Sequence, residues 1–204
     1  QQRNNKDIIT SVPDQREPEI PNEINSLLQK DQAQEQAVVR SLLDFGNLPW
    51  SEDSSVASYI FMQMDEMGLM DCIDDVQMQQ IISHYRKWFD EGISPSAKNF
   101  LYNEDPTLSE AVVKIMLDKN ELSPNWKFHY EGNIPTREDR YREEVASTLH
   151  YLQLKKIKRL IVENQTDLNN NPDPEALLVI LQTHQHLKAL EMELTKKIGT
   201  VILK

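Results

Sequence analysis

A long, uninterrupted helical pattern around residue 150 is the strongest constraint on how this chain can fold. From Val145 onward apolar residues recur at three- and four-residue steps, with no Gly or Pro before Pro172. Thr136 stands three residues before Asp139, and a hydroxyl there would cap free backbone N–H groups. We therefore predict a helix over Thr136–Asn164, about 43 Å long at about 1.5 Å per residue. A small bundle does not need such a helix, so we interpret it as a strut.

The chain before the strut has the pattern of a small helical bundle. In Ser94–Pro95 and Asp105–Pro106 a capping side chain precedes a proline, which suits the first turn of a helix. Residues 120–135 combine aromatic side chains with prolines and predict a loop laid over the bundle. Periodicity and terminal signals together predict helices over 34–45, 55–67, 75–90, 95–102 and 106–118.

The last part of the chain predicts a partner helix for the strut. Asp173-Pro174-Glu175 is a strong helix start, and the apolar alternation that follows to Ile198 suits antiparallel pairing. The predicted fold class is all-α: a small helical bundle joined by a long helix to a C-terminal antiparallel helical hairpin. Residues 1–33 lack Phe, Trp and Tyr and predict a flexible linker. The bundle would then span 34–135, and the long helix with the hairpin 136–204.

Composition excludes several classes of function. No run approaches the roughly 20 apolar residues of a membrane span, and the N-terminus lacks the apolar centre of a signal peptide, so we expect a cytoplasmic protein without a membrane partner. Cys72 is the only cysteine, which excludes an internal disulfide and a cysteine-based zinc site. We found no phosphate-binding loop, nucleophile elbow or Cys-His pair. We therefore expect a chain without catalytic residues, metal or cofactor.

An apolar run just after the turn of the hairpin is the main candidate for a binding surface. A hairpin needs one apolar stripe, yet Leu177-Leu178-Val179-Ile180-Leu181 surrounds almost the whole helix. Exposed apolar patches of this kind mark protein interfaces. The alternative is that the hairpin folds back on the bundle and covers the run. The predicted binding residues are Val162, Leu168, Leu177, Leu178 and Leu181.

A basic run on the strut is the second candidate. Lys155, Lys156, Lys158 and Arg159 could contact phosphates, but helical spacing places them mostly away from Ile157, as on a solvated outer face. Of the net charge of −11, residues 1–136 carry −12, from 11 Lys and Arg against 23 Asp and Glu. This part would repel nucleic acid, so we do not expect direct nucleic-acid binding.

Four stretches stand out together by their order and spacing: Val38–Gly46, Ser55–Ile60, Asn103–Pro106, and Asn120–Ser123 before Trp126. They resemble the C-terminal region of bacterial replicative DNA primases of the DnaG type, most closely the Bacteroidetes version. The resemblance covers about residue 34 to the end. Ser41 and Phe45 depart from it, standing where leucine and tyrosine are expected.

The resemblance implies a helicase-binding domain. In that family the hairpin docks on the N-terminal domains of the hexameric replicative helicase and couples primer synthesis to unwinding. The catalytic domain lies upstream in the same polypeptide, and the zinc and magnesium of the parent enzyme belong to upstream modules. This chain would itself be no enzyme. The alternatives are a nucleic-acid-binding module that uses the basic run, and a self-associating module, including a domain-swapped homodimer.

Overall fold

The computed structural model describes residues 22–103, 105–117, 137–170 and 173–199 of the 204-residue chain. Within these ranges the fold is all-α, and the only β feature is an isolated bridge between Pro49 and Ser55. The elements are α1 (Asn22–Phe45), α2 (Val56–Met67), the 3-10 turn η1 (Leu69–Cys72), α3 (Val76–Asp90), α4 (Ala97–Leu101), α5 (Pro106–Met116), the 3-10 turn η2 (Arg137–Asp139), α7 (Tyr141–Asn169) and α8 (Pro174–Ile198).

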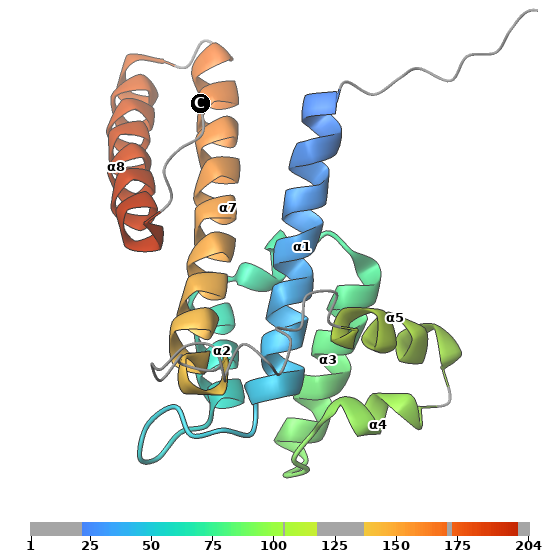
Figure 1. Ribbon diagram of the computed structural model, residues 1–204. Helices are drawn as coiled ribbons and strands as arrows, with labels where there is room; N and C mark the ends of the chain where they lie inside the picture. The colour runs from blue at the N-terminus through green and yellow to red at the C-terminus, as the bar shows by residue number, and fades with distance from the viewer. Residues whose placement is uncertain (1–21, 104, 118–136, 171–172, 200–204) are drawn as a thin grey trace, which may run out of the picture.

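The helices form a bundle from which a hairpin rises (Figure 1). In this view α8 lies beside α7, on the side away from α1. The predicted arrangement of bundle, long helix and antiparallel hairpin is confirmed for the part of the chain that the structure describes.

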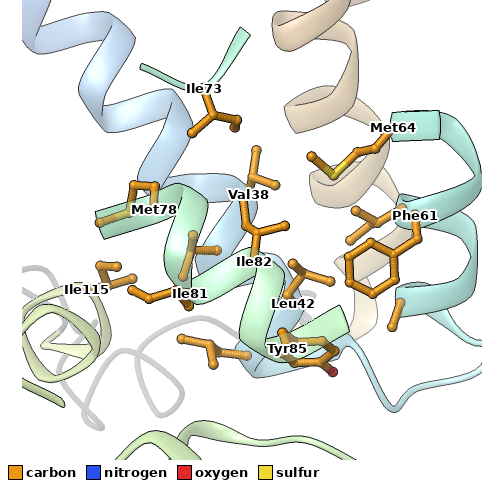
Figure 2. Packing of buried hydrophobic residues seen from close by; sticks show 14 of the residues in the cluster. Val38, Leu42, Phe61, Met64, Ile73, Met78, Ile81, Ile82, Tyr85 and Ile115 are labelled. Atoms are coloured by element: carbon orange, nitrogen blue, oxygen red, sulfur yellow. The ribbon is translucent and has the colours of Figure 1, made fainter. Parts of the chain in front are cut away.

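One apolar core joins the bundle helices to the start of α7. Figure 2 shows Val38 and Leu42 of α1, Phe61 of α2 and Ile82 of α3 pointing toward one another. The first half of α7 adds Val145, Leu149 and Leu152 to the same cluster. The core therefore continues across the predicted domain boundary at 135/136, and α7 is packed into the bundle before it pairs with α8.

Local capping rules placed several helix starts correctly. Ser55 caps α2, where the backbone N–H of Ser58 donates to its Oγ at 3.2 Å. Asp105 caps α5 and Asp173 caps α8, each followed by a proline in the first turn. The start predicted after Ser94 is wrong, because α4 begins at Ala97 and its cap is Ser96.

Two long helices have different bounds from those predicted. α1 begins at Asn22 rather than residue 34, and neither Gly nor Pro occurs between residues 22 and 45 to stop it. Residues 22–33 of the predicted linker are thus helical, whereas 1–21 lie outside the described residues. α7 begins at Tyr141, not at Thr136, because residues 137–139 form the separate turn η2, and it ends at Asn169. Thr136 and the loop predicted over 120–135 also lie outside the described residues.

Leu152→Ala tests whether α7 belongs to the bundle core. Leu152 is 0% exposed, so the cavity should lower the free energy of unfolding by about 2–5 kcal/mol. The same truncation at Leu181, which is 45% exposed, should change it by less than about 1 kcal/mol. Urea unfolding followed by tryptophan fluorescence measures both. Equal losses for the two variants would contradict this assignment.

Candidate docking surface

The hairpin leaves much of α8 uncovered because, among the described elements, α7 is the one that α8 contacts extensively. Leu187 is the only α8 residue that is fully buried within the described part of the chain. A helix in contact with one partner can bury one stripe. Apolar side chains outside that stripe therefore stay in contact with solvent.

Four of the five predicted binding residues are exposed at the tip of the hairpin. The exposed fractions are 38% for Leu177, 60% for Leu178, 45% for Leu181 and 61% for Val162. Leu168 is half-buried. We call these five residues the tip patch. None of the described elements covers its exposed members, in contrast to the alternative in which the hairpin folds back on the bundle.

Three leucines of the tip patch belong to α8 and lie close together around it. At about 100° per residue, Leu181 lies about 40° from Leu177, and Leu178 about 100° from it. Leu178 and Leu181 therefore lie on the side of α8 away from α7, and Leu177 lies at the edge of the stripe that contacts α7. Val179, 61% exposed, lies next to Leu178 in the chain and was not among the predicted binding residues. The sequence contained the signal for it, since Val179 belongs to the same apolar run.

Hydrogen bonds of the buried Asn164 side chain set the axial register of α8 against α7. Asn164 of α7 is buried, and its Nδ2 donates to the carbonyl oxygen of Ile180 at 3.2 Å. Its Oδ1 lies 3.1 Å from Nδ1 of His184. Because an amide oxygen can only accept, His184 must donate from Nδ1. A buried amide satisfied on both sides favours one register of the two helices, which fixes the tip patch in place.

Below the tip, a buried carboxylate joins three separate parts of the chain. Glu35 of α1 is 2% exposed. It accepts hydrogen bonds from the backbone N–H groups of Asp74 and Asp75 at 3.0 and 2.9 Å, and from Lys155 Nζ of α7 at 2.6 Å. A buried carboxylate is stable only when it is paired and fully hydrogen-bonded, and Glu35 meets this condition.

The basic run of α7 binds the segment between α2 and α3. Lys155 also donates to Asp74 at 2.9 Å, and Arg159 donates to both oxygens of Asp74 and to the carbonyl of Asp71. Lys156 donates to the carbonyls of Met67 and Gly68. We call Glu35, Asp74, Lys155, Lys156 and Arg159 the clamp.

The prediction that the basic run forms a solvated outer face is wrong for three of its four residues. Lys155, Lys156 and Arg159 face the bundle, and Lys158 is the one that is exposed. Gly68 fits this contact: its φ of 56° is left-handed, and a Cβ there would lie 2.8 Å from Lys156 Nζ. The sequence could not reveal the clamp, because Glu35 lies 120 positions before Lys155.

Mutual ion pairing favours the charged forms of Asp74, Lys155 and Arg159. Burial alone would raise the pKa of Asp74, but the bonds from Arg159 and Lys155 outweigh it and hold that pKa below its usual value. Burial alone would lower the pKa of Lys155, yet Glu35 and Asp74 keep it above normal. Burial raises the pKa of the nearby Cys72 thiol, which disfavours the reactive thiolate. The clamp is therefore suited to holding α1, α7 and the segment between α2 and α3 together.

A second anchor fixes the start of α7. Arg137 donates to Asp44 of α1 and to Glu144 of α7, and its guanidinium lies 4.8 Å from the centre of the Phe45 ring. The bond to Glu144 is the main reason why the pKa of Arg137 is above its ordinary value. This contact could not be predicted from local patterns, because Arg137 and Asp44 are distant in the chain.

The described ranges contain no group of three or more His, Cys, Asp and Glu side chains placed to hold a metal ion. No helix within them is long and apolar enough to cross a membrane.

Comparisons with known proteins give one match. The family described as a domain of unknown function (DUF8430) matches residues 17–201. No curated protein and no solved structure matches the chain.

Glu35→Ala tests the clamp. The change leaves two backbone N–H groups without their acceptor and removes one partner of Lys155. The free energy of unfolding should therefore fall by about 3–5 kcal/mol. The control is Asp65→Ala, which breaks the exposed ion pair with Arg86 and should cost at most about 1 kcal/mol. Urea unfolding compares the two. A loss for Glu35→Ala no larger than for the control would disprove the structural role of the clamp.

Proposed function

The chain belongs to the family of domains of unknown function DUF8430, and we propose that it is a non-catalytic docking domain whose hairpin tip binds a protein. The partner in this proposal is the replicative hexameric DNA helicase, through its N-terminal domains. The chain would be the helicase-interaction domain of a DNA primase whose catalytic domain lies upstream. It would recruit primer synthesis to the site of unwinding.

The exposed arc of Leu177, Leu178 and Leu181 is the observation that carries the proposal. Complete burial of a leucine side chain contributes about 1.5–3 kcal/mol, so the three could supply at most roughly 5–9 kcal/mol. Loss of translational and rotational freedom costs about 4–15 kcal/mol on association. One tip should therefore bind a single site weakly.

The arrangement of the chain supports a docking role in a second way. α7 is held by the bundle core and by the clamp, whereas the tip patch lies beyond both. A rigid base with an uncovered apolar end suits helix-on-helix recognition. The resemblance of the four sequence stretches to primases names the partner, and the architecture of bundle, long helix and hairpin agrees with what that resemblance implies.

The nucleic-acid alternative receives less support. Lys155, Lys156 and Arg159 already bind carboxylates and carbonyls of the bundle, so they are poorly placed to neutralise phosphates. Of the basic run, Lys158 alone remains exposed.

Leu178→Asp should abolish binding to the N-terminal ring of the helicase, because a carboxylate would be buried in an apolar contact. Fluorescence anisotropy of the labelled full chain measures the affinity, and circular dichroism checks the fold. Met192→Asp is the matched control: Met192 is also exposed, at 61%, but lies about 21 Å farther along α8 at about 1.5 Å per residue. Retained binding by Leu178→Asp, or equal loss in both variants, would refute docking through the tip.

A further inference from the structure

Charge is unevenly distributed along the hairpin. Between Leu160 and Leu187 the chain carries Glu163, Asp167, Asp173 and Glu175 but no Lys or Arg. The basic residues of α7 and α8 lie nearer the base of the hairpin. The end of the hairpin that bears the tip patch is therefore acidic.

Three of the four acids at this end have carboxylates that are not engaged in ion pairs. Glu163, Asp167 and Glu175 are exposed, and no ion pair involves them within the described residues. Asp173 instead accepts from the backbone N–H groups of Glu175 and Ala176 at 3.1 and 2.8 Å as the cap of α8. The free carboxylates would repel nucleic acid and anionic lipid, and would attract a basic surface.

The uncovered apolar surface also extends around α8 farther than one flat contact can cover. Taking Leu177 as the origin, Leu181 lies at about 40°, Leu178 at about 100° and Val179 at about 200°. All four are exposed by 38–61%. The four apolar side chains are thus spread over about 200° of the helix, with the exposed Gln182 and Glu175 between Leu178 and Val179. Side chains spread this widely are all buried only when a partner contacts the helix from two sides.

We propose that the hairpin tip inserts into an apolar groove between two helices of the partner protein, and that Lys and Arg residues line the rim of this groove. The inference rests on the proposed function for the identity of the partner, but its chemistry comes from the tip alone. The leucine arc and Val179 contact opposite walls of the groove. The three free carboxylates meet the basic rim and speed association.

The basic rim of the groove is tested by neutralising the three free carboxylates at the tip. In the triple variant Glu163→Gln, Asp167→Asn, Glu175→Gln, affinity for the helicase N-terminal ring should fall about tenfold at about 0.05 M salt and change little at about 0.5 M. The matched control, Glu52→Gln, Asp53→Asn, Glu91→Gln, removes equal charge from exposed positions of the bundle and should leave affinity unchanged. Equal effects in the two variants would overturn the basic rim.

The groove is tested by Val179→Asp. Contact on two sides predicts that Val179→Asp weakens binding at least tenfold, as Leu178→Asp does. Full affinity with Val179→Asp, together with loss in Leu178→Asp, would overturn the two-walled groove and leave the proposed function intact.

A second probe separates the inference from the identity of the partner. Two designed amphipathic helical peptides, one with leucine and lysine and one with leucine and glutamate, are titrated against the full chain. The tip should bind the lysine peptide at least tenfold more tightly, and this preference should be lost on neutralising the tip but not the bundle. If the helicase ring does not bind while this preference holds, the proposed function fails and the inference stands. Equal binding of both peptides overturns the inference.

Discussion

The buried carboxylate of Glu35 holds three elements of the fold together. It lies on α1, accepts from the backbone that leads into α3, and binds a lysine of α7. A buried charge is expensive unless it is fully paired, so these three elements can adopt only arrangements that keep its partners in place. Through Asp74 the same network reaches Arg159, the last residue of α7 that the clamp holds.

This constraint gives α7 two different halves. Its first half completes the apolar core of the bundle, and its last turns, beyond Arg159, hold the end of the hairpin that bears the tip patch. From Arg159 to the end of the helix at Asn169 the projection is about 15 Å, at about 1.5 Å per residue. Because Leu152 belongs to the core, a truncation before α7 would open the bundle, so point substitutions at the tip test function more cleanly.

Local rules explain what could be predicted from the sequence. Ser55, Asp105 and Asp173 cap helices because a short polar side chain and its neighbours suffice for that role. The exposed tip could be predicted because an apolar run wider than one stripe cannot be covered by a single helix. Before α4 the capping rule predicted Ser94 as the cap, whereas the structure has Ser96 in that role.

Contacts between distant parts of the chain could not be predicted in the same way. Lys155 and Arg159 look like solvent-exposed charges in sequence, and only the fold brings them to Glu35 and Asp74. The pairing of Arg137 with Asp44 could not be predicted for the same reason. Arg137 lies in the turn η2, just before α7 begins at Tyr141. Periodicity predicts which face of a helix a residue occupies, but it does not predict which other element contacts that face.

Amide hydrogen exchange of the chain with and without the N-terminal ring of the helicase tests whether the hairpin tip is the docking surface. Docking through the tip predicts slower exchange on binding in residues 160–169 and 174–182, at the tip of the hairpin. It also predicts unchanged exchange in residues 67–75, which the clamp already holds. Protection confined to the bundle, or no change anywhere, would contradict a docking role for the tip.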